Sequence, residues 1–453
     1  MGEDGQLPLK RELTVWHLMA LGIGAIIGTG VFVLIGTATV GTPSRPGAGP
    51  GIVVSFLASG LVCALAALCY AEFSSMMPVA GSAYSYTYAS LGEVVAWLTG
   101  WNLILEYGVA SAVVAIGWSG YCVNVLESFG IFLPEWLLHA PEGGRSGLIN
   151  LPAVVISLVI MLLLFVGTKR SVQVTSIIVG IKLVVIAFFL IVGVGEVRPV
   201  NWSPFFPNGW GGVGAAAAII FFAYIGFDAV STAAEEAKHP QRDLPLAILG
   251  SLGFCLLIYM AVAAVLTGMT PIDQIDIHAP VADALKHIGY PWGSVVVAVG
   301  ALAGITSVLL VMMLGQIRIF FAMSRDGLLS PRLALIHSTY RTPSVATLVT
   351  GCGVAILAGF LPIGEAADMT NIGTLFAFCL VCLGVWWLRV TQPHRPRSFR
   401  LPLMPVIPLL GMTSCVGLML FLPTLTWMRF GLWTLVGIVV YLLYGRRRSL
   451  LDL

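Results

Sequence analysis

The chain alternates long apolar stretches with short polar ones. Twelve apolar blocks, most of roughly 20 to 30 residues, are each long enough to cross a bilayer core of about 30 Å. They lie at about 14–40, 51–77, 93–126, 151–168, 172–195, 213–236, 244–270, 292–323, 343–361, 367–390, 402–424 and 430–445. The connections are rich in Pro and Gly, as in GTPSRPGAGPG and QPHRPRSFRLP, which cannot continue a helix. This pattern predicts an all-α integral membrane protein with twelve transmembrane helices.

Composition supports a lipid environment and excludes several functional classes. Only 10% of the residues are charged and 58% are hydrophobic, whereas a soluble protein carries about 25% charged residues. A net charge of +2, from scattered basic residues, argues against nucleic-acid binding. The seven His residues all fall at or beyond the ends of the blocks, which leaves no metal-ligand set at mid-membrane. We therefore expect neither an enzyme nor a metal or organic cofactor.

Basic residues are distributed unequally between alternate connections. Sixteen Lys and Arg residues fall on one side of the predicted membrane and five on the other, the latter being Arg45, Arg145, Arg198, Lys286 and Arg429. The basic side of a membrane protein usually faces the cytoplasm. We therefore expect a multi-pass protein of the plasma membrane with cytoplasmic termini, residues 1–12 and 447–453.

Two of the apolar blocks contain residues that interrupt a helix. The first carries glycines at 22, 24, 28 and 30, and the sixth carries Gly226 and Asp228 within FFAYIGFDAV. Each Gly costs a helix about 1 kcal/mol relative to Ala, so both blocks are predicted to unwind at mid-membrane. Close helix packing of the GxxxG kind is an alternative for Gly24 and Gly28. Interruptions five blocks apart predict two inverted five-helix repeats, 13–195 and 196–390, followed by helices 11 and 12 at 391–446.

Broken helices expose peptide groups that suit one kind of ligand. Beyond the first break, the amides of Gly28, Thr29 and Gly30 are unpaired and lie at the positive end of a half-helix, which attracts a carboxylate. Carbonyls freed near Ile23–Ile26 and around Phe222, Ala223 and Ile225 suit an ammonium group. Together these groups predict a site for the backbone of an α-amino acid.

Two ionisable residues lie deep within apolar blocks, where charge is costly and a functional role is the first hypothesis. Lys182, in the fifth block, is predicted to brace the inner end of the first helix against the eighth near Thr306 and Ser307. Its ammonium would occupy the position of a coupling sodium ion. Desolvation would favour the loss of its proton. A purely structural tether is the alternative. Glu106, in the third block, could pair with a base, carry protons or face the substrate.

Other acids and the pocket lining have simpler interpretations. Asp228 is interpreted as a structural cap, and Glu72 as a residue near the cytoplasmic end of its helix that needs no buried charge. Apolar candidates for the pocket, Met312 among them, favour a small neutral side chain over a long cationic one.

Several motifs resemble one family of membrane proteins. GIGAIIGTGVF, CYAEF, GSAYSYTY, FFAYIGFDAVSTAAEE, HPQRDLP and FAMSRDGLLS, spread over residues 22–330, resemble the cationic amino acid transporter family of the amino acid-polyamine-organocation superfamily, particularly its bacterial ApaT-like members. The resemblance extends over roughly residues 10–447. The loop GTPSRPGAGPG is longer and richer in Pro than in similar sequences.

The resemblance implies a fold, a site and an activity. The fold would be a LeuT-type five-plus-five inverted repeat with broken helices 1 and 6, and the activity proton-coupled amino acid symport. The resemblance implies substrate contacts at Ile26, Gly28, Thr29, Gly30, Phe222, Ala223, Ile225, Glu106 and Met312, with Lys182 in place of a second sodium ion. A small neutral amino acid such as L-alanine is the expected substrate and H⁺ the expected coupling ion.

Alternatives to symport remain open at this stage. They are amino acid exchange, transport of cationic amino acids and, from another class, a sensor that binds an amino acid without transporting it. The expected partners are the amino acid and the lipid bilayer. A small accessory membrane protein is left open, as is the oligomeric state, with a monomer as the working assumption.

Overall fold

The computed structural model describes residues 13–43, 45–77, 82–141, 147–167 and 171–449. The predicted segment 1–12, residues 450–453 of the predicted tail, and the basic residues Arg145, Lys169 and Arg170 lie outside these ranges.

The described chain is almost entirely helical. The first half contains α1 (Val15–Ile26), η1 (Gly30–Leu34), α2 (Ile35–Val40), η2 (Gly49–Gly51), α3 (Ile52–Met76), α4 (Ser82–Leu91), α5 (Glu93–Ser128), η3 (Glu135–Leu137), α6 (Leu151–Val166) and α7 (Ser171–Val194). The second half contains η4 (Pro199–Trp202), α8 (Gly209–Ile220), η5 (Phe221–Tyr224), η6 (Phe227–Glu236), α9 (Pro240–Met269), η7 (Ile272–Gln274), α10 (Pro280–His287), α11 (Pro291–Arg325), η8 (Pro331–Ala334), α12 (Ser344–Phe360) and α13 (Ile363–Thr391). After these come α14 (Val406–Met419), α15 (Thr424–Val440), η9 (Tyr441–Gly445) and α16 (Arg446–Arg448).

Most of the predicted spans correspond to helices of membrane-crossing length. Within the described ranges, eight helices are long and apolar enough to cross a bilayer, and the bent pair formed by Val15–Ile26 and Gly30–Val40 raises this number to nine. The remaining predicted blocks contain the shorter apolar helices α6, α12 and α14, of 16, 17 and 14 residues. At a rise of 1.5 Å per residue these helices are about 21 to 26 Å long, less than the bilayer core of about 30 Å. The count of twelve spans therefore stays a prediction.

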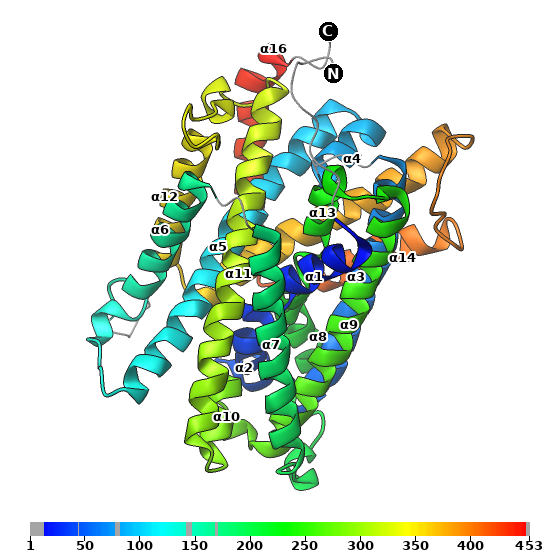
Figure 1. Ribbon diagram of the computed structural model, residues 1–453. Helices are drawn as coiled ribbons and strands as arrows, with labels where there is room; N and C mark the ends of the chain where they lie inside the picture. The colour runs from blue at the N-terminus through cyan, green and yellow to red at the C-terminus, as the bar shows by residue number, and fades with distance from the viewer. Residues whose placement is uncertain (1–12, 44, 78–81, 142–146, 168–170, 450–453) are drawn as a thin grey trace.

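The helices form an elongated bundle with two distinct ends (Figure 1). α16 lies at one end and α10 at the other, and α7, α9 and α11 run between them. Inside the bundle α5 packs along α11 and α13, and α3 packs along α9, while α6 and α12 pair on one flank (Figure 1). We refer below to the α16 end and the α10 end.

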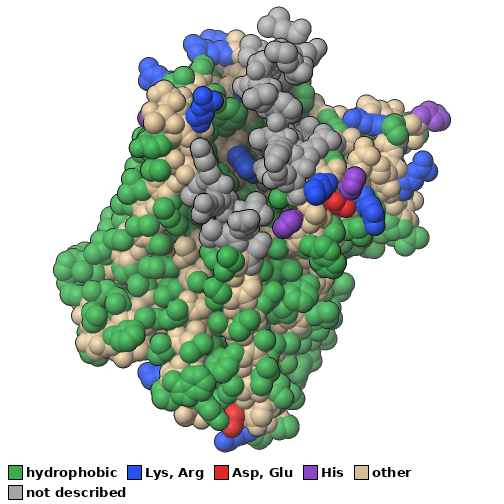
Figure 2. Space-filling model, viewed as in Figure 1, with side chains coloured by type: hydrophobic (Ala, Val, Ile, Leu, Met, Phe, Trp, Pro, Cys, Tyr) green, Lys and Arg blue, Asp and Glu red, His purple; other side chains and the backbone are tan. Residues whose placement is uncertain are grey.

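The outer surface matches a lipid environment. Figure 2 shows hydrophobic side chains over most of the middle of the visible face, with Lys, Arg and His gathered mainly towards the α16 end. Leu162 and Ile191 are among many large apolar side chains exposed on helices α6 and α7. A soluble monomer rarely exposes so continuous an apolar surface, so this belt marks where lipid covers the protein.

Glu72, in α3, corrects one expectation from the sequence. It was interpreted as a residue that needs no buried charge, but its side chain is fully buried. Its carboxylate accepts hydrogen bonds from Arg389 Nε and Nη2 (both 2.7 Å), Arg397 Nε (3.0 Å) and the backbone N–H of Leu401 (2.7 Å). The acid is buried because it anchors the α13–α14 connection to α3.

The Pro-rich loop after α2 contains two short paired strands. Strands β1 (Gly41–Thr42) and β2 (Arg45–Pro46) pair antiparallel, with Thr42 opposite Arg45. The Arg45 guanidinium lies 2.8 Å from the Asp368 carboxylate near the start of α13. This ion pair ties the short hairpin to the other half of the bundle.

Candidate functional site

The first apolar block is interrupted where its glycines predicted. Helix α1 ends at Ile26, Ile27 adopts an extended conformation (ψ 105°), and a π-helical turn, η1, begins at Gly30. The two segments are inclined by 40°. The first amides of the second segment have no carbonyl one turn earlier to bond. The break therefore leaves peptide donors on one side and the last carbonyls of α1 on the other.

The sixth block contains the second predicted interruption. After α8 and the short turn η5, Ile225 is extended (ψ 136°) and Gly226 is left-handed (φ +116°), and η6 then continues with 3₁₀ geometry. A residue with a side chain would be strained at this positive φ. Gly226 therefore permits the interruption between η5 and η6.

The two breaks are in direct contact. A Cβ placed on Gly226 would lie 2.9 Å from the carbonyl oxygen of Ala25, and one placed on Gly30 would lie 2.3 Å from Cα of Ala223. Only glycine permits these backbone approaches. The glycines thus bring the backbones of the two interrupted helices into contact.

A tyrosine that sequence analysis did not single out joins the two breaks. The hydroxyl of Tyr259, in α9, lies 2.8 Å from the carbonyl oxygen of Ile26 and 2.9 Å from that of Ala223. A hydroxyl has one proton to donate, so the two carbonyls share it. The only signal in the sequence was a polar atom within the apolar run LLIYMAV.

Lys182 lies where the sequence placed it. Its side chain is fully buried, and its ammonium donates to the carbonyl oxygens of Gly24 (2.7 Å) and Ile27 (2.8 Å) and contacts Ser307 Oγ (3.4 Å). Thr306, the other expected neighbour, instead accepts a hydrogen bond from Trp118 Nε1. The ammonium therefore compensates carbonyls at the end of α1 and connects α7 to α1 and α11.

The other predicted substrate residues are buried around the breaks. Thr29 is 1% exposed, packs against Gly117 of α5, and has a hydroxyl with no hydrogen-bond partner among the described residues. Gly28 packs against Val308 of α11, one helical turn from the buried Met312. Ile26, Phe222, Ala223 and Ile225 are each at most 6% exposed. These residues are packed around the two breaks, and Thr29 alone among them carries a polar side chain.

Glu106 belongs to a different part of the bundle. It is 1% exposed on α5, eleven residues from Gly117, which places it about 16 Å along the helix from the Thr29 contact. The displacement is towards the α16 end, because Glu93, at the start of α5, bonds to Tyr441 and Ser449. Its electrostatic neighbour is Asp228 in η6.

Asp228 has side-chain partners on other helices. The N-cap of η6 is Gly226, which has no side chain. Oδ2 of Asp228 instead accepts hydrogen bonds from Tyr107 Oη and from Ser82 Oγ (3.4 Å). The residue therefore ties η6 to α5 and α4.

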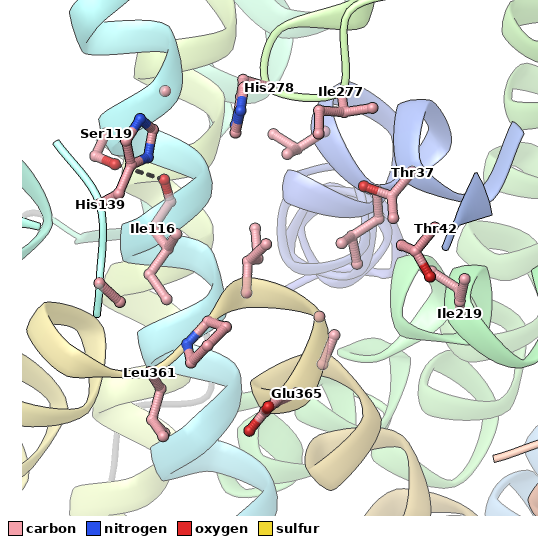
Figure 3. Close-up of a pocket in the computed structure, with 18 of the residues that line it drawn as sticks. Thr37, Thr42, Ile116, Ser119, His139, Ile219, Ile277, His278, Leu361 and Glu365 are labelled. Carbon is pink, nitrogen blue, oxygen red and sulfur yellow. Dashed lines mark hydrogen bonds between the residues drawn. The ribbon is translucent and has the colours of Figure 1, made fainter. Parts of the chain in front are cut away.

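A large cavity opens on the α10 side of the breaks. It has a volume of about 820 Å³ and is lined by residues of η1, α2, α5, α10 and α13 and of the segment before α10. Figure 3 shows Ile116 and Ser119 of α5 on one side, Thr37 and Thr42 on the other, and Glu365 below them. The lining reaches Val33 and Leu34, a few residues beyond Gly30. We call this cavity the vestibule; its lining does not include the predicted substrate residues around the breaks.

These features define a class of protein: a multi-pass helical membrane protein with two interrupted helices in contact inside the bundle and a vestibule beside them. Discontinuous helices of this kind typically form binding sites of secondary transporters.

Comparison with known proteins identifies the family. The amino acid permease family model matches residues 13–443. The chain is 48% identical over 452 residues to the branched-chain amino acid permease BcaP of Bacillus subtilis (strain 168), covering 99% of this chain and 96% of that protein. It is 46% identical over 444 residues to the methylthioribose transporter of the same organism, covering 98% and 95%.

A plant protein extends the similarity to cationic amino acid transporters. Cationic amino acid transporter 4, vacuolar, of Arabidopsis thaliana is 36% identical over 398 residues, covering 86% of this chain and 65% of that protein. The chain belongs to the amino acid permease family, within the amino acid-polyamine-organocation superfamily, and is a transporter rather than an enzyme.

Proposed function

We propose that this permease is a proton-coupled symporter of small neutral L-amino acids, with L-alanine as the representative substrate. It would act by alternating access around the contact between the two breaks. We assign it to the plasma membrane, with the α16 end and, from the distribution of basic residues, both termini in the cytoplasm. The observation that carries the proposal is that the interruptions of two helices meet, with Gly30 against Ala223 and Gly226 against Ala25.

The chemistry of this contact suits an α-amino acid. The amides of Gly28, Thr29 and Gly30 can donate to a carboxylate at a half-helix N-terminus. Carbonyls of η5 and of the end of α1 already accept from Tyr259 and Lys182, but each carbonyl oxygen has a second lone pair with which to accept from an ammonium group. Transporter sites of this type form at the membrane midplane between discontinuous helices. The substrate would thus be recognised largely by its backbone.

The lining of the site sets the expected side chain. Ile26, Ile225, Phe222 and Met312 are buried and apolar, which supports a neutral aliphatic side chain. The similarity to a branched-chain amino acid permease supports the same class. Leucine and its analogues therefore belong among the competitors to be tested.

Lys182 supports coupling to protons rather than to a metal cation. Its ammonium occupies the space between the end of α1 and α11 and bonds two carbonyls there. A metal ion and a protonated lysine would compete for this position. Release and rebinding of the lysine proton during the cycle is the proposed coupling step.

Uptake into proteoliposomes tests the proposal. Labelled L-alanine should accumulate under an inward proton gradient, and L-leucine should compete more strongly than L-arginine. Absence of uptake under every ion gradient, together with undiminished binding in a thermal-shift assay, would favour a sensor. Uptake that requires preloaded amino acid, without net proton movement, would favour an exchanger.

A sugar thioether is a second candidate substrate, favoured by the 46% identity to a methylthioribose transporter. Methylthioribose should therefore be added to the competition assay. Competition by methylthioribose that exceeds competition by every amino acid would replace the proposed substrate class.

A further inference from the structure

Two histidines lie next to each other at the edge of the vestibule. His139 belongs to the connection between η3 and α6, and His278 belongs to the segment between η7 and α10. Both line the cavity (Figure 3). Their ring centroids are 5.6 Å apart, and the ring planes are inclined by 36°. The fold therefore brings together two imidazoles from different halves of the chain, on the α10 side of the breaks.

The backbone of His278 is fixed from two sides. Asp276 Oδ1 accepts hydrogen bonds from the backbone N–H groups of His278 and Ala279 (both 2.7 Å). On the other side, a Cβ placed on Gly120 of α5 would lie 3.2 Å from the carbonyl oxygen of His278. The glycine thus lets this segment approach α5 closely, while the side chain of His278 stays exposed.

The neighbouring residue of α5 holds the connection that carries His139. Ser119 Oγ accepts a hydrogen bond from Asn150 Nδ2 (2.8 Å) at the start of α6. Gly147, just before it, packs on His139, because a Cβ placed there would lie 2.6 Å from the carbonyl oxygen of His139. Both histidine backbones are therefore positioned by packing on adjacent residues of one helix.

The distance between the rings suits coordination of one metal ion by both. Zn–N bonds of about 2.0 to 2.1 Å place two imidazoles of a tetrahedral site with their ring centroids roughly 5 Å apart. The observed 5.6 Å requires only a small rotation of the side chains. Imidazole nitrogens suit Zn²⁺, Ni²⁺ and Cu²⁺, whereas Mg²⁺ and Ca²⁺ prefer oxygen ligands. Within the described ranges, no group of three or more His, Cys, Asp or Glu side chains suits a metal ion, so water must complete the coordination.

Charges around the vestibule favour a cation. Its acidic lining residues are Glu127, Asp276, Asp283, Glu365 and Asp368, and its basic lining residues are Arg45, Lys286 and Arg429. Both arginines are paired with acids of the same lining, Arg45 with Asp368 (2.8 Å) and Arg429 with Glu365 (2.6 Å). Three acids then remain against one lysine. A cleft with an excess of one charge raises the local concentration of ions of the opposite charge.

We propose that His139 and His278 form a binding site for one divalent transition-metal ion, such as Zn²⁺, which bridges the η3–α6 connection and the segment before α10. Each imidazole contributes the lone pair of one ring nitrogen, and its other nitrogen remains available for a hydrogen bond. The ion is separate from the proposed substrate site, whose residues do not line this cavity. Because water completes its coordination, the ion exchanges with the solution.

The bridge has a consequence for transport, and this part of the proposal rests on the proposed alternating access. The segment of His278 follows α9, which packs against α1 and η6, whereas the connection of His139 leads into α6, which packs against α5 and α12. Alternating access moves one group of helices against the other. An ion that binds both imidazoles at their present separation favours the state with this vestibule open. Bound metal should therefore slow uptake.

Isothermal titration of ZnCl₂ into the purified full chain, without a polyhistidine tag and in nanodiscs, tests the site without requiring transport. Affinity should fall at least about tenfold in His139→Ala and in His278→Ala, because each change removes one of two protein ligands. His287→Ala is the matched control, because His287 is also exposed at the α10 end but pairs with Asp283 (3.0 Å) and does not line the vestibule. This variant should keep the wild-type affinity, and MgCl₂ should not bind at this site.

Electron paramagnetic resonance of bound Cu²⁺ gives a second readout. The wild type should show coupling to two imidazole nitrogens, and each alanine variant should show coupling to one or none. Equal Zn²⁺ affinity in the wild type and both alanine variants, or loss of binding in His287→Ala alone, would overturn the site. If an alanine variant is not monodisperse, His139→Gln or His278→Gln replaces it with the same expectation.

Uptake into proteoliposomes separates this inference from the proposed function. Zn²⁺ should slow uptake of labelled L-alanine by the wild type and leave uptake by His278→Ala unchanged. Binding without any effect on uptake would contradict the bridge. Histidine-dependent binding in a protein that transports no amino acid retains the metal site and rejects the proposed function. Uptake without histidine-dependent binding retains the function and rejects the site.

Discussion

Two buried glutamates of this permease differ sharply in their surroundings. Glu72, near the C-terminal end of α3, accepts four hydrogen bonds, three of them from Arg389 and Arg397. Glu106, deep in α5, accepts at most one from the described residues, from Thr374. A carboxylate whose lone pairs are all used is fixed in one state, whereas one with so few partners can change protonation or bind a ligand. The contrast separates the parts of the bundle that hold the fold from those that can take part in a transport cycle.

Around Glu72, burial and ion pairing have opposite effects on the pKa of a basic side chain. Arg397 lies in the connection between α13 and α14. Burial lowers the pKa of its guanidinium, and the nearby Glu72 carboxylate acts in the opposite direction. The same end contains Tyr84, whose hydroxyl donates to Asp326 (2.7 Å). Burial, reinforced by that carboxylate, raises the pKa of Tyr84, so the hydroxyl remains a donor at every physiological pH.

The largest effect on stability is expected at Glu72. Glu72→Ala leaves two guanidinium groups without their shared carboxylate, and breaking a buried ion pair costs about 3 to 5 kcal/mol. The thermal midpoint in a fixed detergent, followed by fluorescence-detected size exclusion, should fall strongly. Glu106→Gln serves as the contrast and should change the midpoint little, because Gln keeps an oxygen that can accept a hydrogen bond from Thr374. Equal shifts in the two variants would break the comparison.

Replacement of Lys182 should have the largest effect on transport. Lys182→Ala removes the ammonium that bonds the carbonyls of Gly24 and Ile27. Hydrogen bonds to charged groups contribute about 1.5 to 3 kcal/mol each, so proton-driven uptake should fall at least about a hundredfold. Ser307→Ala, which removes only the 3.4 Å contact, is the control and should reduce uptake much less. Unchanged coupling in Lys182→Ala would refute the assigned role.

A smaller effect is expected at Tyr259. Tyr259→Phe removes the hydroxyl shared by the carbonyls of Ile26 and Ala223, which costs about 1 to 2 kcal/mol. Because the bond joins the two broken helices, L-alanine affinity should weaken about tenfold while expression stays normal. Equilibrium binding of labelled L-alanine checks this, and wild-type affinity in the variant would show that the junction does not depend on the hydroxyl.

The smallest effect is expected at the vestibule rim. Arg429 and Glu365 form an ion pair of 2.6 Å, but their side chains are 38% and 44% exposed. Exposed pairs contribute about 0 to 1 kcal/mol, so Arg429→Gln should leave the thermal midpoint nearly unchanged. A shift in the thermal midpoint as large as that of Glu72→Ala would show that burial and the number of hydrogen-bond partners do not determine how much each carboxylate contributes to stability.

The sequence predicted the features that depend on local chemistry. The glycines at 28, 30 and 226 indicated where two helices unwind, and Lys182 indicated where a buried charge needs carbonyl partners. Both kinds of signal act within one apolar block, because an interruption or a charge in such a block has few physical solutions.

Features that depend on distant pairing were not predictable in this way. Glu72 and Arg389 are 317 residues apart, and Tyr259 reaches carbonyls of two other helices. A single sequence carries no record of such contacts. The count of twelve spans stays a prediction.

Binding of L-alanine and two analogues, measured by isothermal titration on the purified protein, tests the central claim most directly. L-Alaninamide lacks the carboxylate to which the amides of Gly28 to Gly30 would donate hydrogen bonds. L-Lactate lacks the ammonium group that would donate hydrogen bonds to the carbonyls at the breaks. The account predicts a clear binding isotherm for L-alanine and at least a hundredfold weaker binding of both analogues. Comparable affinity for either analogue would contradict recognition of a zwitterion by the broken helices.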